Sequence, residues 1–323
     1  MRRRALLGFA LGTGALAALP RPDARAAAAC GLMIGAPAGS GGDRIARNFA
    51  RCFARHLDSA QVEPINHPGN AGHDMLAALA DAPPTGATIG WIVTPTLPAR
   101  AIDRSDPTLI GRIRLLGHVE REPIAFVSQS DNPADSVQEI IRRAGEDADA
   151  VPLATPPPGS PPHLAALRLQ DTAQTRLNIV TFPSSAAARQ ALIAGNVSAA
   201  ALGLSEVIGP VLDGTLSALG IAAHRRFGLL PDTPVLDEAG IPLHAFIHRG
   251  VGVPVGTPQS VVDRLAAALQ AAVADETFQQ QADKAGYYAA WSDGEAWSRQ
   301  MRQEHETLVK LWQTDPWLAS SNG

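Results

Sequence analysis

Short apolar runs alternate along this chain with longer segments in which apolar residues recur every three to four positions. Short runs are typical of buried strands, and the longer period is typical of amphipathic helices. We expect strands at residues 32–36, 62–66, 88–93, 114–119, 123–128, 151–154, 178–182, 197–202, 216–222 and 245–253. We expect helices at residues 42–57, 71–80, 135–144, 161–171, 185–193, 205–212, 258–274 and 292–312. This alternation predicts an α/β fold around mostly parallel sheets.

The first residues have the features of a secretion signal. Arg2 to Arg4 are followed by an apolar stretch at 5–19, too short to span a bilayer comfortably, and then by Ala24-Arg25-Ala26. We interpret residues 1–26 as a cleaved signal peptide and expect the protein in the periplasm. Export by the Sec or the twin-arginine route stays open. A lipid anchor on Cys30 is disfavoured because alanines precede it and not the leucine-containing context expected of a lipoprotein.

Composition excludes several classes of function. The chain has 27 basic and 31 acidic residues, and residues 1–26 hold five arginines and one aspartate, which leaves 22 basic and 30 acidic residues, or about −8. A nucleic-acid partner is therefore not expected. No later stretch is long enough to cross a membrane, so we expect a soluble protein. The remaining length predicts about two domains.

Two cysteines would meet an oxidising compartment. Cys30 lies near the expected mature N-terminus and Cys52 lies in the first expected helix. A disulfide and two independent thiols both remain open. We identify no histidine or second cysteine near either cysteine at the spacing of metal ligands. We therefore expect no catalytic or metal-binding role for the cysteines, and no cofactor.

Four loops rich in glycine, serine and proline each follow an expected strand and precede a helix. They span 35–43, 66–72, 155–162 and 183–185. Backbone N–H groups at a helix start attract anions. In open α/β sheets, ligands bind beyond the carboxyl ends of strands, where such loops converge. The pattern predicts one shared site for a small carboxylate or phosphate.

Five motifs in this chain occur in the same order in one known family. The first family motif, V-P-F-A-A-G-G-x-x-D, corresponds to Ile34 to Asp43, with Ser40 in place of the second paired glycine. The other family motifs and the residues of this chain that match them are N-x-P-G-A-G-G at 66–72, G-S-S-P-H-L at 159–164, R-s-x-L-L-P-D-V-P-T-x-x-E-A-G-x-P at 226–242 and A-P-A-G-T-P at 253–258. The chain resembles the substrate-binding receptors of tripartite tricarboxylate transporters, the Bug family of periplasmic solute-binding proteins.

The resemblance implies a two-lobed clamshell of the type II periplasmic-binding-protein kind, with a mostly parallel sheet flanked by helices in each lobe. The chain would cross between lobes near 122–125 and 246–250. Lobe 1 would contain residues 27–123 plus 249–323, and lobe 2 would contain residues 124–248. The implied protein is a monomeric, non-enzymatic receptor that delivers a small carboxylate to a large and a small integral membrane subunit.

The loops and the resemblance together give the candidate ligand-binding residues. Those expected in lobe 1 are Gly39, Ser40, Gly41, Asp43, Asn70, Ala71, Gly72 and Thr94, and those in lobe 2 are Gly159, Ser160, His163, Ser184, Ser185, Gly203 and His248. Structural roles compete with ligand contact. Each glycine can serve backbone geometry alone, Asp43 is favoured as a helix cap, His163 as a structural hydrogen bonder, and Ser160 as a donor or an N-cap.

Departures from the family bear on the ligand. Where the family often has V-D-V-M-F-D-N, residues 197–203 lack both acidic positions. We expect a ligand without an ammonium group, because a cleft carboxylate would suit one. His248 or Arg249 would bring positive charge to the hinge side of the cleft or face solvent. The proline run at 156–158 leaves the geometry of the third loop open.

Two other functions are weighed against a transport receptor. A secreted α/β hydrolase is disfavoured because Ala38 replaces the first glycine of a G-x-S-x-G elbow around Ser40. The same loop lacks the Lys-Ser/Thr ending of a phosphate-binding loop. A periplasmic sensor partnering a two-component system remains open, because it would use the same ligand-driven closure.

Overall fold

The computed structural model describes residues 30–57, 61–131 and 135–318. The predicted signal peptide, residues 1–26, lies outside them. The strands are β1 (Cys30–Ile34), β2 (Val62–Asn66), β3 (Thr88–Thr94), β4 (Ile113–Gln129), β5 (Pro152–Thr155), β6 (Asn178–Thr181), β7 (Ala199–Gly203), β8 (Leu216–Ile221), β9 (Phe246–Pro254) and β10 (Tyr288–Asp293).

The helices match most of the expected ones and add several that hydrophobic periodicity missed. They are α1 (Gly41–Ala54), α2 (His73–Asp81), α3 (Thr96–Asp103), α4 (Leu109–Arg112), α5 (Val137–Glu146), α6 (Pro161–Ala173), α7 (Ser185–Ile193), α8 (Leu204–Leu212), α9 (Gln259–Ala274), α10 (Glu276–Ala285) and α11 (Gly294–Thr314), with 3₁₀ turns η1 (Asn70–Gly72) and η2 (Leu236–Ala239). The helices α3, α4 and α10 and the strand β10 are absent from the sequence prediction. Helices α3 and α4 are short, and α10 buries Phe278 and Ala282 among mostly polar residues, so their periodic signals are weak.

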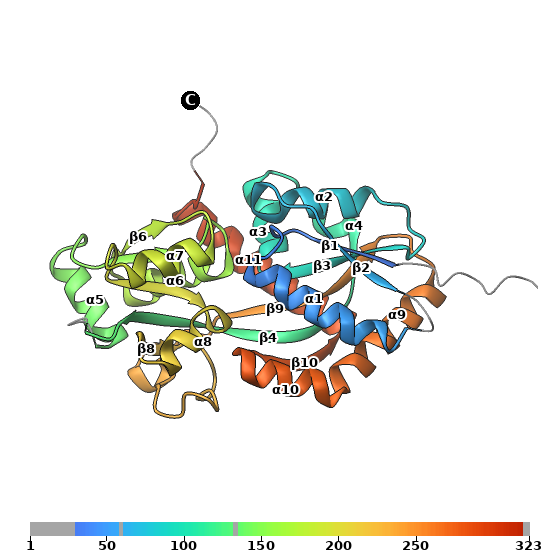
Figure 1. Cartoon of the computed structure of the whole chain (residues 1–323). Helices are drawn as coiled ribbons and strands as arrows, with labels where there is room; N and C mark the ends of the chain where they lie inside the picture. The colour runs from blue at the N-terminus through green and yellow to red at the C-terminus, as the bar shows by residue number, and fades with distance from the viewer. Residues whose placement is uncertain (1–29, 58–60, 132–134, 319–323) are drawn as a thin grey trace, which may run out of the picture.

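Two lobes share the long strand β4 (Figure 1). In lobe 1 the strand order is β2-β1-β3-β9-β4, with β10 also on β4, and in lobe 2 it is β4-β7-β5-β6, with β8 also on β4. The β1–β2, β1–β3, β5–β6 and β5–β7 pairs are parallel. The pairs of β4 with its neighbours are antiparallel. The α/β clamshell expected from the sequence is confirmed, but its sheets are mixed rather than mostly parallel as expected. The β3–β9 pair is antiparallel as well, and the parallel pairs lie away from the shared strand.

The strands expected at 114–119 and 123–128 are one continuous strand, β4. Polar Glu120 to Glu122 interrupt the apolar pattern between them, so periodicity predicts two strands. Both Glu120 and Glu122 are fully buried, because β9 pairs beside them through the junction of the lobes. The expected lobe boundaries, at 123/124 and 248/249, fall within this paired stretch and stay a prediction.

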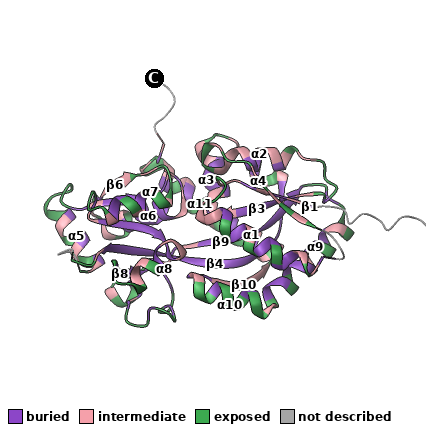
Figure 2. Ribbon diagram, viewed as in Figure 1, coloured by how far each residue is buried: buried purple, intermediate pink, exposed green. Residues whose placement is uncertain are grey.

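Helices cover both faces of each sheet, and the central strands are buried throughout (Figure 2). In lobe 2, Ile124 and Phe126 of β4 pack toward α5 and α6. The intervening Ala125 and Val127 pack toward α7 and α8. Because side chains alternate along a strand, a strand covered on both faces must be apolar at successive positions. That is why these segments read as continuous apolar runs.

The last helix, α11, packs against residues of both lobes (Figure 1). Its first part packs in lobe 1, where Trp297 belongs to a core cluster with residues of α2 and α3. Its end and Trp317 form a cluster with Ala99 of α3 and with Leu164 and Leu167 of α6. Apolar contact between the lobes therefore runs through the C-terminal segment as well as through β4 and β9.

Candidate functional site

A cavity of about 710 Å³ lies between the two lobes. Its walls come from all four glycine-, serine- and proline-rich loops that the sequence singled out. Lobe 1 contributes residues 35–42 with Arg44, Pro68, Gly69, Ala71, Gly72 and Thr96, and lobe 2 contributes Pro156, Pro157, Ser160, 183–186, Arg189 and Glu206. We call this cavity the interlobe cleft. The four loops therefore converge on one cavity, as the sequence predicts.

The first loop is held in shape by Asp43, which is only 2% exposed. Its carboxylate accepts a hydrogen bond from the Gly39 amide at 2.8 Å and others from Asn66 and Arg47. Burial acts to raise the pKa of Asp43, but these hydrogen bonds outweigh it and the pKa is lowered. Ser40 is the N-cap of α1 and accepts from the Asp43 amide at 3.3 Å. Asp43 therefore fixes the loop from the first turn of α1, whereas the N-cap of that helix is Ser40, which lines the cleft.

The second loop brings a single turn, η1, to the edge of the cleft. Asn70 and Ala71 have positive φ values of 46° and 53°. The Asn70 side chain donates to Asp74 at 2.8 Å. Ala71 and Gly72 line the cleft, whereas Asn70 is not among its lining residues.

In lobe 2, α6 and α7 both begin at the cleft with a serine at the N-cap. Ser184 accepts from the Ala187 amide at 3.1 Å, so its oxygen already caps α7. Ser160 makes no such bond, although it stands at the N-cap of α6. Its buried hydroxyl has no hydrogen-bond partner and lines the cleft. The Ser160 hydroxyl is therefore available to form a hydrogen bond with a ligand in the cleft.

Gly159 and His163 lie behind Ser160 and support it. The Gly159 amide donates to His163 Nδ1 at 3.4 Å, and burial lowers the pKa of His163 to about 4. Gly159 has φ of +70°, and a side chain there would clash with Arg100 and Trp317. Arg100, from α3 of lobe 1, donates to the Pro158 carbonyl at 2.9 Å. His163 thus acts as a structural hydrogen-bond acceptor, and the third loop is tied to lobe 1.

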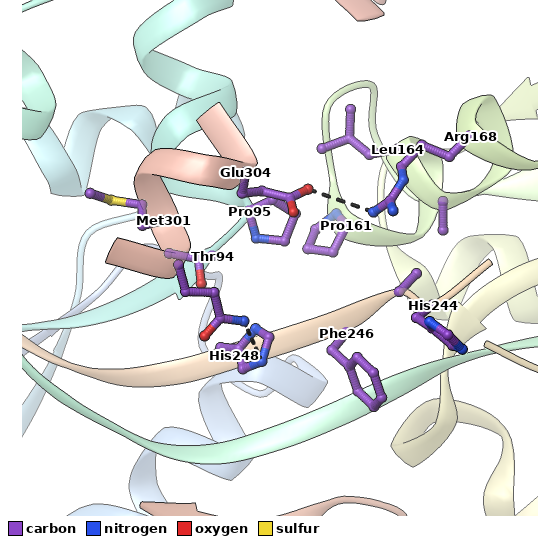
Figure 3. Close-up of a pocket in the computed structure, with 13 residues that line it drawn as sticks. Thr94, Pro95, Pro161, Leu164, Arg168, His244, Phe246, His248, Met301 and Glu304 are labelled. Atoms are coloured by element: carbon purple, nitrogen blue, oxygen red, sulfur yellow. Dashed lines mark hydrogen bonds and ion pairs between the residues drawn. The ribbon is translucent and has the colours of Figure 1, made fainter. Parts of the chain in front are cut away.

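Thr94 and His248 line a different cavity, of about 140 Å³, between α11, α6 and β9 (Figure 3). Thr94 accepts from Trp297 Nε1 at 3.0 Å, and His248 contacts Gln300 at 3.1 Å. Burial, with neighbouring His118, lowers the pKa of His248 to about 3, so its ring is neutral. The expectation that His248 brings positive charge to the cleft or faces solvent does not fit a buried neutral ring.

Arg249, the next residue, faces the other side of β9 and is buried at the hinge. Its Nη1 donates to Glu120 Oε1 and to Glu122 Oε2, each at 2.6 Å. Its positive charge is therefore compensated within the protein. Gly203, at the end of β7, lies against Glu122, and a side chain at this position would clash with that carboxylate. Gly203 is not among the residues that line the cleft.

Three charged residues that the sequence analysis did not select line the interlobe cleft: Arg44, Arg189 and Glu206. Arg44 Nη1 donates to the Gly39 carbonyl at 2.9 Å. Arg189 Nη1 donates to Glu206 Oε2 at 3.0 Å. Burial raises the pKa of Glu206, with Glu122 adding to the effect and Arg189 opposing it. Their proximity to cleft loops in sequence was the available signal, since Glu206 lies in the first turn of α8 and Arg189 lies one turn into α7.

The cysteines form no disulfide, and both are buried. Burial raises the pKa of each thiol to about 11. Cys52 Sγ, His56 and Asp275 place ligand atoms within 4.8 Å of one another, so the expectation that no histidine stands near a cysteine was wrong. His56 lies one helical turn beyond Cys52. Arg55 already donates to Cys52 Sγ at 3.4 Å and to Asp275 at 2.7 Å.

Comparison with known families gives the chain its class. Residues 45–310 match the model of the tripartite tricarboxylate transporter family receptor. The chain belongs to this family. A UPF0065 protein of Bordetella bronchiseptica is 27% identical over 294 residues, which cover 88% of this chain and 84% of that protein. BugT of Bordetella pertussis is 24% identical over 273 residues, covering 81% of each.

Solved structures of receptors share the fold. BugD, described as a periplasmic binding protein, matches with a TM-score of 0.77 at 23% identity, covering 88% of this chain and 97% of that one. Rpa4515 of R. palustris with adipate gives 0.79 at 21% identity, covering 88% and 96%. MatC of Rhodopseudomonas palustris with bound malate gives 0.76 at 22% identity, covering 88% and 98%. In the described part of this chain, no helix is long and apolar enough to cross a bilayer.

Proposed function

We propose that this protein is a periplasmic, non-enzymatic receptor that captures a small carboxylate in the interlobe cleft and delivers it to the membrane subunits of a tripartite transporter. The observation that supports it best is the unpaired, buried Ser160 hydroxyl at a cleft where α1, α6 and α7 all begin. A carboxylate there would accept hydrogen bonds from both lobes only when they are closed, so binding favours closure.

The magnitudes suffice for useful affinity. Each helix N-terminus contributes about 0.3 to 1 kcal/mol, or up to ~2 when partly buried. Each hydrogen bond to a charged group contributes about 1.5 to 3 kcal/mol. Micromolar binding requires about 8 kcal/mol net. Three helix starts with serine and backbone donors reach that range, even after the costs of association. Relatives with bound adipate and malate support a carboxylate as the ligand.

The test is isothermal titration of the protein lacking residues 1–26 with mono-, di- and tricarboxylates. Ser160→Ala should weaken carboxylate binding about tenfold or more while leaving thermal stability nearly unchanged, because the hydroxyl has no partner in the protein. The control is Ser260→Ala, an exposed serine on α9. Binding of a sugar or peptide but of no carboxylate would refute the proposal.

The panel also tests the absence of an ammonium group from the ligand. We propose it because residues 197–203 lack the acidic positions of relatives, and because Glu206, a carboxylate that does line the cleft, is already paired with Arg189. We expect 4-hydroxybutyrate to bind more tightly than 4-aminobutyrate. The reverse order would overturn that part of the proposal. Delivery to a transporter is tested separately, by uptake in cells that carry the adjacent membrane subunits with and without this receptor.

A further inference from the structure

Glu206 places a carboxylate in the interlobe cleft at the point where an anion is expected to bind α1. Glu206 belongs to α8 of lobe 2, yet its Oε1 lies so close to Gly41 of lobe 1 that a side chain on Gly41 would clash with it. Gly41 is the first residue of α1, whose N-terminal amides attract negative charge. The protein therefore already supplies an anion at the lobe 1 end of the cleft.

This carboxylate is held in place by its neighbours. Glu206 Oε2 accepts from Arg189 Nη1 at 3.0 Å, and the same nitrogen donates to the Glu206 carbonyl at 2.7 Å. The Ser205 amide, in the first turn of α8, already donates to Glu122 Oε1 at 2.8 Å. Glu206 is thus fixed by Arg189 from α7, and its carboxylate is directed across the cleft toward α1.

The two ends of the cleft therefore offer different groups to a ligand. At the lobe 2 end, Ser160 and the start of α7 are available to a carboxylate. At the lobe 1 end, the Gly39 and Ser40 amides already donate to Asp43 and to the Pro37 carbonyl. A carboxylate that bonds to the next amide, that of Gly41, must lie beside Glu206. Two neighbouring carboxylates repel each other and cannot hydrogen-bond to each other, and the ion pair with Arg189 offsets only part of this repulsion. A neutral hydroxyl in the same place can instead donate a hydrogen bond to Glu206.

We propose that Glu206 makes the cleft selective for monocarboxylates that carry a neutral hydrogen-bond donor, such as a hydroxyl, at the far end, and excludes matched dicarboxylates. This inference rests on the proposed function of the cleft and specifies its ligand class. It separates this chain from the relatives that hold adipate and malate, which carry two carboxylates.

The experiment titrates two matched pairs into the protein lacking residues 1–26: 4-hydroxybutyrate against succinate, and 6-hydroxyhexanoate against adipate. In each pair the chain length is equal and only the far end differs. One of the two hydroxy acids will bind more tightly than the other. We expect that hydroxy acid to have at least tenfold higher affinity than the dicarboxylate of the same chain length. In Glu206→Gln, which keeps the size but loses the charge, the dicarboxylate should gain at least tenfold relative to the hydroxy acid.

Glu63→Gln on β2, an exposed acidic position outside the cleft, is the matched control and should leave both affinities unchanged. Equal or preferred binding of the dicarboxylates by the unaltered protein would overturn the inference while the proposed function stands. Failure of the unaltered protein to bind any carboxylate would instead remove the proposed function. Because the preference of the unaltered protein is itself a readout, misfolding of a variant does not obscure the result.

Discussion

At the scale of single residues, what distinguishes structural from ligand-facing groups here is whether their polar atoms already have partners. Asp43 satisfies its carboxylate within the first loop, so its contribution is to fix that loop. Ser160 keeps a hydroxyl without a partner at the cleft. Both residues belong to the family motifs, and only their hydrogen bonds separate their roles.

His163 should make the protein sensitive to mild acid. Its pKa is lowered from the ordinary 6.5 to about 4 by burial. Because the unfolded chain binds the proton first, stability is lost as pH falls from about 6.5 to about 4, by on the order of 3 kcal/mol at about 1.4 kcal/mol per pKa unit. His163→Gln, which keeps a hydrogen-bond acceptor for Gly159, should reduce the loss of unfolding free energy between pH 6.5 and pH 4.

The measurement is urea unfolding between pH 4 and 8 for the unaltered protein and the variant. Glu120 acts in the opposite direction over an overlapping range, because burial raises its pKa to about 7. Only the difference between the two proteins isolates His163. Parallel pH curves would contradict a buried, neutral histidine at this position.

At the scale of elements, β4 and β9 pair where the two lobes meet, and an internal salt bridge lies between them. Arg249 on β9 compensates Glu120 and Glu122 on β4, and all three are buried. A paired charge in the interior costs little net free energy, but an unpaired one costs several kcal/mol. The polar residues that interrupt the apolar pattern of β4 are thus accommodated by the partner strand.

Arg249→Met should lower the free energy of unfolding by about 3 to 5 kcal/mol, because two buried carboxylates lose their counterion. Restoring charge balance should recover part of this loss, so Arg249→Met combined with Glu120→Gln is expected to be more stable than Arg249→Met alone. Urea unfolding at pH 7.5 measures both. A single variant as stable as the unaltered protein would show that the pair is not required.

At the scale of the whole molecule, the C-terminal segment links the lobes beside the third cleft loop, where a side chain on Gly159 would meet Trp317. Trp317 is 6% exposed and donates from Nε1 to Asp103 Oδ2 of α3 at 2.7 Å. It shares a cluster with Leu164 of α6, so one side chain contacts both lobes. The Arg168 to Glu304 ion pair, at 3.8 Å, spans the same side (Figure 3).

Trp317→Ala should cost about 3 to 5 kcal/mol of stability, the usual range for removing a buried aromatic. It should also loosen the lobes relative to each other, which small-angle scattering of the ligand-free protein would detect as a larger radius of gyration. Trp312→Ala, at a half-buried position on α11 whose ring contacts that of Trp317, is the comparison and should have a smaller effect on both. An unchanged radius with lowered stability would limit Trp317 to a packing role.

The sequence by itself determined the features that depend on local signals. Apolar runs placed most strands, and the loops at 35–43 and 155–162 carried the anion-attracting pattern and the family motifs, because glycine, serine and proline dictate backbone geometry close to where they stand. Ser40 and Ser184 cap their helices for the same local reason.

Only the tertiary structure decided which side chains share the cleft. His248 belongs to another cavity, and Glu206 and Arg189 enter the cleft from two different helices. Residues far apart in sequence meet there because the lobes face each other across β4 and β9, and no periodic pattern encodes that approach. The same reason explains why the sequence did not predict β4 as one strand: Arg249, the partner of Glu120 and Glu122, is more than a hundred residues away in sequence.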